Sequence, residues 1–363
     1  MIRAGFFIAR FLTCIRNGGM SMRVRTYGKI DEAGPGRWDE LVASCGAPLF
    51  YRSAFLRAFE RFPLHSVQAH FYIVGEDAQG GLVFATPVYL LKGVDPMKIL
   101  NNYFADYGGE LILVNHVWHC YDTWIPARGL DPDVVGAVLW AMEALAADLG
   151  VALWGFTNVD GTGELSRALT AAGMVGVQVE ERFLVDLTPI PDIDRYLALL
   201  NQPVRQNLRR YMRIAERAGI VAQVAPVEHA DLDGFVALAR AGAAKYGNAD
   251  YYRPGIFEDF LRALGGHVRV FEQRLEGRLI GSTVLLVDET TLHWWVAGND
   301  YTAVPQISPF YLAFLAAIKE AMATGKVVVE AGRRNPRFKT RHGLRPRPVQ
   351  SHFLPTFQRA VEG

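Results

Sequence analysis

The chain has 363 residues, half of them hydrophobic, and a formal net charge of +1 at pH 7. This length suits two domains, and this composition excludes a disordered or fibrous protein. The near-neutral charge argues against a nucleic-acid coat and against DNA as a partner. Three scattered cysteines make neither a disulfide framework nor a zinc pattern and suit a reducing cytoplasm, so we predict a cytoplasmic globular protein.

The first 22 residues are predicted to form an extension before the first domain. Their apolar run is interrupted by Arg10 and Arg16, so it makes a poor signal peptide. Polar residues recur every seven positions, which favours a helix with one polar face. This helix could make weak contact with a membrane surface through residues 1–20, or it could cap the domain; alternatively, the protein begins near Met20 or Met22. No stretch of the sequence is long and apolar enough to span a bilayer.

The first half of the chain alternates strand and helix patterns. Apolar residues at every second position predict strands, and apolar residues at helical spacing predict helices. The turn at 77–81 is rich in Asp and Gly, which is typical of a hairpin between two strands. The predicted elements are a strand at 23–27, helices at 36–45 and 53–62, strands at 66–74 and 82–91, a helix at 131–150, a strand at 151–156, a helix at 163–172 and a strand at 175–187.

The same order of elements recurs in the second half. The predicted elements there are a strand at 220–225, helices at 231–246 and 254–264, strands at 268–275, 279–287 and 291–296, a helix at 307–324 and a strand at 327–329. Two copies of one α/β unit are the simplest account of this repeat. We therefore predict a first domain at 23–187, a linker with a basic helix at 188–219 and a second domain at 220–363.

A cationic loop follows the last predicted strand of the second copy. Between residues 331 and 347 the sequence carries arginines and one lysine but no acidic residue. Such dense like charge is unfavourable unless an anionic group lies among the side chains. We predict that an anionic donor binds here, and the residues that would contact it are Arg333, Arg334, Arg337 and Arg341.

A second group of arginines precedes the second domain. Arg205, Arg209 and Arg213 lie at i, i+4 steps of a predicted helix, and Glu216 is the nearest residue of opposite charge. Like charges at this spacing destabilise a helix. Because guanidinium groups form bidentate bonds with phosphate, the stripe is predicted to contact phosphate or RNA. The alternative is a solvated helix face without a partner.

Three segments of the sequence have counterparts in a known group of enzymes. They are the basic helix at 205–213, the strand, proline loop and long helix at 293–324, and Glu330-x-Gly followed by Phe338, Lys339 and Gly343. These segments resemble the GNAT acyltransferases, and their tandem arrangement resembles the Fem-type peptidyltransferases and the Fem-like, peptidoglycan-biosynthesis-type acetyltransferases. The resemblance implies two α/β domains, each with a mixed sheet that splays near its middle to hold the acyl carrier. It also implies that Lys339 contacts the transferring acyl group.

Acyl transfer to an amine requires a carbonyl oxygen that is stabilised as it gains charge and an amine that loses its proton. Lys339 is the candidate for the first task, and the alternative is a solvated lysine in a basic loop. Phe338 would exclude water or simply pack in the core. Asp106, beside Tyr107 in a glycine- and aromatic-rich insertion, is the candidate for binding the amine or accepting its proton. Asp106 could instead bond to its own turn.

Further residues are predicted to line the site for the acceptor amine. Lys245 and Tyr246 lie at a glycine turn between two predicted helices, although a plain surface turn fits equally well. Trp295 lies in a predicted strand, and Glu330 lies at the end of one, where such folds place functional groups. Glu330 is more simply explained as the ion-pair partner of an arginine in the cationic loop.

No metal and no tightly bound cofactor is predicted. His116, His119 and Cys120 are close in sequence but have no fourth ligand nearby. GNAT enzymes that use acetyl-CoA usually carry a Q/R-x-x-G-x-G/A loop before the long helix, and the segment 298–306 departs from that pattern. The resemblance therefore favours aminoacyl-tRNA as the donor, with acyl-CoA or an acyl-carrier protein as the alternative.

These features together predict an N-acyltransferase that forms an amide bond directly, without a covalent enzyme intermediate. The acceptor would be an amine of a small molecule or of a peptidoglycan-type precursor. A second alternative is a module without catalytic activity that uses its basic face to bind RNA or a partner protein.

Overall fold

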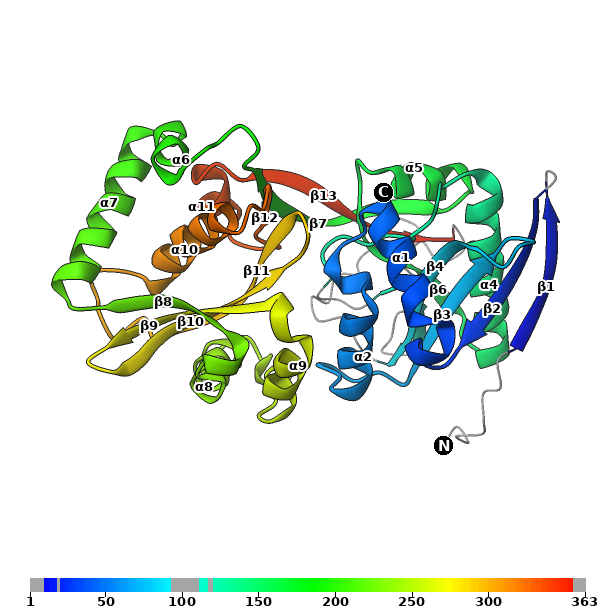
Figure 1. The fold of residues 1–363 in the computed structure, drawn as a ribbon, viewed down its shortest axis with the longest axis horizontal. Helices are drawn as coiled ribbons and strands as arrows, with labels where there is room; N and C mark the ends of the chain where they lie inside the picture. The colour runs from blue at the N-terminus through cyan, green and yellow to red at the C-terminus, as the bar shows by residue number, and fades with distance from the viewer. Residues whose placement is uncertain (1–9, 18–19, 93–110, 117–119, 355–363) are drawn as a thin grey trace, which may run out of the picture. The chain divides into compact units, whose positions relative to one another are not determined.

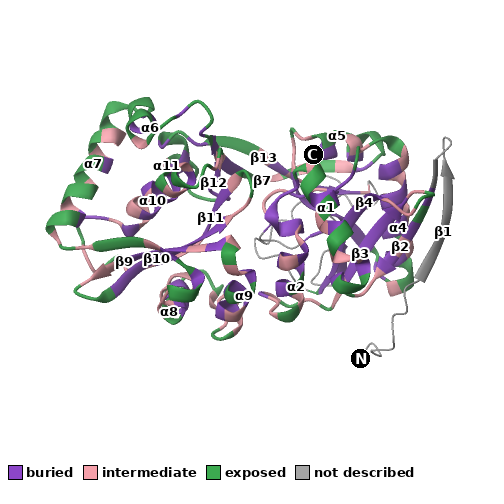
Figure 2. Ribbon diagram, viewed as in Figure 1, coloured by how far each residue is buried: buried purple, intermediate pink, exposed green. Residues whose placement is uncertain are grey.

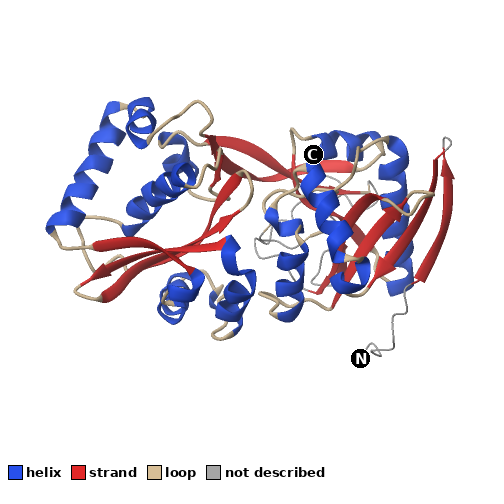
Figure 3. Cartoon of the chain, in the orientation of Figure 1, coloured by secondary structure: helices blue, strands red, loops and turns tan. Residues whose placement is uncertain are grey.

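The computed structural model of the protein describes residues 10–17, 20–92, 111–116 and 120–354. The chain divides into two compact units (Figure 1). Unit 1 comprises residues 1–60, 66–180 and 348–363, and unit 2 comprises residues 61–65 and 181–347. In each unit helices pack against a sheet (Figure 3).

Unit 1 is built around a mixed sheet. Its strands follow the order β1-β2-β3-β4-β5-β6-β13-β7, with β5 and β6 parallel and the pairs from β1 to β5 antiparallel. The elements are β1 (Arg10–Asn17), β2 (Met20–Tyr27), α1 (Pro35–Cys45), α2 (Ser53–Arg61), β3 (Ala69–Glu76), β4 (Leu82–Lys92), β5 (Leu111–Val114), α4 (Pro132–Leu149), β6 (Leu153–Asp160), α5 (Glu164–Ala171), β7 (Val175–Asp186) and β13 (Arg345–Phe353).

Unit 2 repeats this design. Its strands follow the order β7-β12-β11-β10-β9-β8, with β11 and β12 parallel and the other pairs antiparallel. The elements are α6 (Ile193–Leu199), α7 (Gln202–Arg217), β8 (Val221–Pro226), α8 (Leu232–Ala244), α9 (Ile256–Leu264), β9 (Val268–Leu275), β10 (Arg278–Val287), β11 (Thr291–Asn299), α10 (Pro309–Ala323), β12 (Val328–Glu330) and α11 (Pro336–Arg341). Helices α8 and α9 lie on one side of these strands, and α7, α10 and α11 lie on the other (Figure 1).

The order of elements confirms the predicted tandem α/β fold. From β2 to β7 and from β8 to β13, each half runs strand, two helices, three strands, helix, strand, short helix, strand. Part of the last strand of each half belongs to the sheet of the other unit. Residues 181–186 of β7 lie in unit 2, where Leu184, Val185 and Asp186 pair with β12, and residues 348–353 of β13 lie in unit 1, where they pair with β6.

The helix predicted near the N-terminus is wrong over residues 10–17. These residues form β1, which pairs antiparallel with β2 from Arg10↔Thr26 to Asn17↔Met20. Phe11, Thr13 and Ile15 are residue types with high strand propensity, and the neighbouring edge of β2 supplies the partner that overrides a helical pattern. Within the described residues, no helix is long and apolar enough to cross a membrane.

Each unit has its own hydrophobic core beneath the long helix of its sheet. Val138 and Met142 of α4 pack with Phe156 in unit 1, and Phe314 and Ile318 of α10 pack in the corresponding core of unit 2. The strands are largely buried, whereas much of α7 is exposed (Figure 2). The long helices therefore fix the strands against which the candidate site is built.

Candidate active site between β11 and β12

Strands β11 and β12 separate within unit 2. They pair in parallel only from Thr291↔Val328 to His293↔Glu330, while β11 continues to Asn299 in contact with β10. Beyond His293, β12 therefore offers β11 no backbone partner. A pocket of about 130 Å³ occupies this split, and its lining residues are Trp294, Trp295, Val296, Ala297, Phe310, Ala331, Arg333, Asn335 and Lys339. For unit 2, this agrees with the sheet splay that the resemblance implied for each domain.

Lys339 lies in the wall of this pocket and is buried, with 3% of its surface exposed. Its Nζ donates hydrogen bonds to the carbonyl oxygens of Gly332, at 2.9 Å, and Arg333, at 2.5 Å. The ammonium also lies 5.3 Å from the centre of the Phe183 ring. The alternative of a solvated lysine is therefore wrong, and the side chain anchors the loop that precedes its own helix.

The loop that Lys339 anchors has a strained backbone. Gly332, Arg334 and Asn335 all have positive φ, at 64°, 68° and 54°. For non-glycine residues this conformation costs of order 1 kcal/mol each and persists only where the surroundings enforce it. The two bonds from Lys339 and the start of α11 at Pro336 provide that constraint. Strain of this kind is common at functional sites.

Glu330 ends β12 and is buried, with 3% of its surface exposed. Its Oε2 lies 3.2 Å from Nη1 of Arg182, and its Oε1 accepts a hydrogen bond from the backbone N–H of Gly332 at 3.0 Å. Glu330 thus pairs with an arginine of β7, and its expected pairing with an arginine of the cationic loop stays a prediction. Arg182 belongs to β7, two residues before Leu184, the partner of Glu330 in the strand register.

Phe338 packs in an aromatic cluster rather than lining the pocket. Its ring stacks on His342 with centroids 4.0 Å apart and meets Phe310 at 4.8 Å and Phe314 at 5.4 Å. Phe310 in turn lines the pocket in contact with Trp294, with ring centroids 4.7 Å apart. Sequence reasoning missed this aromatic wall, although Phe310 lies in the first turn of the helix predicted at 307–324.

The acceptor candidates fall in different places. Trp295 is 5% exposed, lines the pocket and stacks on Phe257 with ring centroids 5.9 Å apart. Lys245 and Tyr246 follow α8, are exposed and are not among the lining residues of the pocket. Asp106 and Tyr107 lie outside the described residues.

Comparisons with known proteins find the same fold in other structures and a family model that matches part of the sequence. Residues 202–340 match the family model for the acetyltransferase (GNAT) domain. The chain has the Fem-like tandem GNAT fold. The crystal structure of FemX aligns with a TM-score of 0.61 at 10% identity, over 89% of this chain and 96% of FemX. A comparison with curated proteins finds no match to the sequence.

Two further structures share the fold. The C-terminal domain of a putative lysylphosphatidylglycerol synthetase from Agrobacterium fabrum aligns with a TM-score of 0.56 at 13% identity, over 89% of this chain and 92% of that domain. A tandem GNAT protein from the clavulanic acid biosynthesis pathway aligns with a TM-score of 0.55 at 14% identity, over 91% and 98% of the two chains. Residues 202–340, which match the GNAT domain model, all lie in unit 2, which is called the GNAT domain below.

The arginines of the GNAT domain form two separate groups. Arg333 lines the pocket, and Arg334, Arg337 and Arg341 are exposed on the loop and helix beside it. The α7 group lies elsewhere. Arg205 donates to the carbonyl oxygens of Ala198 at 3.3 Å and Leu200 at 3.1 Å, while the hollow that contains Arg209 and Arg213 has the lining residues Gln206, Arg209, Met212, Arg213 and Glu216.

The N-terminus of α10 in the GNAT domain lacks a side-chain cap. Ser308 occupies the cap position, but its side chain makes no capping hydrogen bond. The first backbone N–H groups of a helix have no partner within the helix, and together with the helix dipole they attract anions. Phe310, two residues further on, lines the pocket. The positive end of α10 therefore lies next to the split between β11 and β12.

The structure describes two of the three residues with metal-like spacing. His116 is buried, and its Nε2 lies 3.0 Å from the carbonyl oxygen of Phe50. Burial lowers the pKa of His116 to about 3. Cys120 is buried as well, and His119 lies outside the described residues. Among the described residues, no group of His, Cys, Asp and Glu could hold a metal ion.

Proposed function

We propose that this acyltransferase forms an amide bond by moving an aminoacyl group from tRNA to an amine of a small-molecule or peptidoglycan-type acceptor. The observation that carries the proposal is the split between β11 and β12, with Lys339 in its wall, a cationic loop at its side and the uncapped end of α10 next to it. An acyl ester bound in the split would present its carbonyl to backbone groups of β11 that β12 leaves without a strand partner.

The reaction needs no covalent enzyme intermediate. The amine nitrogen attacks the ester carbonyl, the bond to the ribose oxygen breaks, and the proton lost by the amine passes to that oxygen. Fixed dipoles and charges that face the developing oxyanion lower the barrier. Lys339 is proposed to supply this stabilisation, both directly and by holding the loop at Arg333. Asp106 stays the proposed partner of the acceptor amine, with Trp295 forming a wall of its site.

Several features support a polyanionic donor. Arg333, Arg334, Arg337 and Arg341 all lie on the loop and short helix that border the pocket. Arginine suits contacts with phosphate, and the open N-terminus of α10 attracts anions in the same way. FemX and the lysylphosphatidylglycerol synthetase domain share the fold, which is consistent with aminoacyl transfer. The tandem GNAT protein from the clavulanic acid pathway is described in a form without acetyl-CoA, which makes acyl-CoA the donor to test alongside tRNA.

The test is a binding titration against charged and uncharged tRNA and against acetyl-CoA, at several salt concentrations. We expect charged tRNA to bind with a steep salt dependence, because each phosphate contact releases counterions. Replacing Arg337 and Arg341 with alanine should reduce the slope of log K against log salt by about 1 for each arginine. Arg167→Ala, on α5 of unit 1, is the matched control and should leave the slope unchanged.

The outcomes separate the donors. Saturable binding of acetyl-CoA, together with weak tRNA binding that does not distinguish the charged form, would replace tRNA with acyl-CoA as the donor. Equal salt slopes for the wild type and the double variant would remove the loop arginines from the donor site. Absence of binding to both donors would overturn the proposal in either form.

A further inference from the structure

The two units differ at the outer edge of their sheets. In unit 1, β1 pairs with the outer edge of β2, the first strand of the repeat. The corresponding strand of unit 2 is β8, and it is the terminal strand of the sheet order. Among the described residues, no strand pairs with its outer edge. The pairing of β1 with β2 in unit 1 thus shows how an additional strand can pair with the outer edge of β8 in unit 2.

The edge of β8 lacks the usual protection against pairing with another chain. Exposed edge strands are commonly guarded by charged residues, bulges or prolines. The segment from Val221 to Ala225 carries no charge, and its register with β9 runs without a bulge to Pro226, where the strand ends. Val221 is 65% exposed. This edge is therefore competent to accept an added strand.

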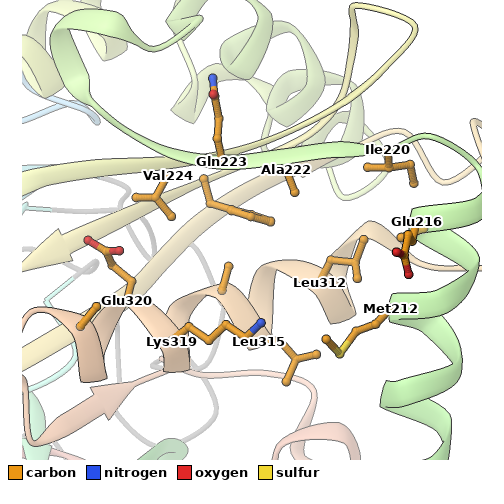
Figure 4. Close-up of a pocket in the computed structure, with 14 residues that line it drawn as sticks. Met212, Glu216, Ile220, Ala222, Gln223, Val224, Leu312, Leu315, Lys319 and Glu320 are labelled. Carbon is orange, nitrogen blue, oxygen red and sulfur yellow. The ribbon is translucent and has the colours of Figure 1, made fainter. Parts of the chain in front are cut away.

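An apolar groove lies beside this edge. It has a volume of about 470 Å³, and its walls come from α7, β8 and α10. Figure 4 shows Met212 of α7 and Leu312 and Leu315 of α10 on the side of the groove that faces β8. Side chains of a strand point alternately to its two faces. Every second side chain of a strand added to β8 would therefore reach this groove.

The groove itself is lined by Glu216, Lys319 and Glu320 as well as apolar residues, whereas the α7 surface beside it is cationic. Helix α7 carries five arginines and one glutamate. Arg209 and Arg213 line a hollow that shares Met212 and Glu216 with the groove. An extended segment that enters the groove and also bears acidic residues would therefore be complementary to this surface in both shape and charge.

We propose that β8 docks an extended acidic segment of a partner protein, which adds to the sheet as a strand and places alternate apolar side chains in the groove. Backbone hydrogen bonds along the edge would provide affinity, and the groove would select the side chains. The lining favours protein over RNA, because single-stranded RNA stacks its bases on exposed aromatic rings and the aromatic lining residue here, Phe271, is 5% exposed. The surface is distinct from the catalytic pocket, whose lining residues are different.

The test uses the full chain and a short fluorescein-labelled peptide of alternating valine and threonine with glutamate at both ends. Fluorescence anisotropy should show saturable binding, and exchanging the terminal glutamates for lysines should weaken it by about tenfold. Two N-methylated peptides report strand addition. Only alternate N–H groups of an added strand face β8, so methylation of one alternating set should abolish binding and methylation of the other should preserve it.

Variants of the protein locate the site. Ala316→Phe fills the groove without a change of charge and should weaken binding, whereas Leu199→Phe, at an exposed apolar residue of α6, should not. Replacing Arg209 and Arg213 together with alanine should weaken binding more than Arg217→Ala does. Thermal unfolding of each variant verifies that it is folded.

Two results would overturn the proposal. The first is equal binding of both methylated peptides, which would exclude strand addition, or equal binding of the glutamate and lysine peptides, which would exclude a contribution of charge. The second is absence of peptide binding combined with tRNA binding that the Arg209 and Arg213 replacements abolish. That result would assign the α7 arginines to RNA.

Discussion

In unit 1 the strands that correspond to β11 and β12 are β5 and β6, and buried side chains surround the residues that follow β5. β5 and β6 pair from Ile112↔Leu153 to Val114↔Gly155. The next residues, Asn115 and His116, are buried. The His116 ring lies 4.7 Å from the Tyr51 ring centre and 5.9 Å from that of Tyr89. In unit 2 the residues after the last pair line a pocket instead. The same fold thus supports a packed aromatic core in one copy and a site in the other.

The short helices α5 and α11 show the same contrast. Arg167 of α5 is exposed and donates to the carbonyl oxygen of Thr162 at 2.8 Å. Lys339 of α11 is buried and donates to two loop carbonyls. In both units a cation on the short helix anchors the preceding loop, and in unit 2 this cation also lines the split between two parallel strands. The proposed catalytic role is therefore assigned to Lys339 of unit 2 and not to Arg167 of unit 1.

The largest expected effect concerns the buried ion pair between Arg182 and Glu330. Arg182→Met should destabilise the protein by about 3–5 kcal/mol, because it removes the guanidinium group that pairs with the buried Glu330 carboxylate. Urea unfolding measures the change, and Arg167→Met in unit 1 is the exposed control. Adding Glu330→Leu to Arg182→Met should recover much of the loss. A double variant that is less stable than Arg182→Met would contradict this account of the pair.

Lys339→Met should reduce the rate of amide formation by about 10²–10³-fold, because the loop loses its anchor and the oxyanion loses a positive charge. The measurement is single-turnover transfer from charged tRNA, with Arg167→Met as the control. We expect that control to keep nearly all its activity, since Arg167 is exposed. Full activity of a folded Lys339→Met protein would remove the catalytic role of Lys339 and leave the two units equivalent at this position.

Acid should destabilise unit 1 through its buried histidines. Burial lowers the pKa of His116 to about 3 and the pKa values of His70 and His352 to about 4. Because these folded pKa values lie below the ordinary value of 6.5, the unfolded chain binds more protons between the two values. The resulting stability is complete above pH 6.5 and is lost as pH falls toward 3 or 4.

For His116 the loss should reach about 2 kcal/mol between pH 6.5 and about pH 5. Urea unfolding of the wild type and of His116→Phe across this range measures it, and the variant should lose less stability than the wild type as pH falls. Parallel pH profiles for the two proteins would show that His116 does not cause the acid sensitivity.

The sequence was informative where the signal is local. The repeat, the hairpin around 77–81 and the basic segment at 331–347 follow from periodicity and charge within short windows. The sequence could not show which side chains that are far apart in the chain lie in contact in the fold. Arg182 and Glu330 are 148 residues apart and meet only because β7 enters the sheet of unit 2. β1 likewise depends on the edge of β2, which overrides a pattern that favoured a helix.

The smallest effect concerns the N-termini of the two long helices. In α4 the Asp131 side chain accepts hydrogen bonds from the N–H groups of Asp133 at 3.0 Å and Val134 at 2.9 Å. In α10 Ser308 makes no such bond. Asp131→Ala should therefore cost about 1 kcal/mol of stability, whereas Ser308→Ala should cost much less. Urea unfolding of the two variants measures this difference.

Ser308→Asp would give α10 the cap that α4 already has. It should stabilise the free protein by up to about 1 kcal/mol, because an aspartate can bond to the first N–H groups and favours the positive end of the helix dipole. The same carboxylate would occupy the groups proposed to attract donor phosphate and would repel it, so donor binding should weaken while stability rises. A variant that is more stable but binds the donor more weakly would show that the N-terminus of α10 is left uncapped for its ligand. Unchanged donor affinity in a stabilised variant would exclude α10 from the donor site and assign phosphate binding to the arginines of the loop alone.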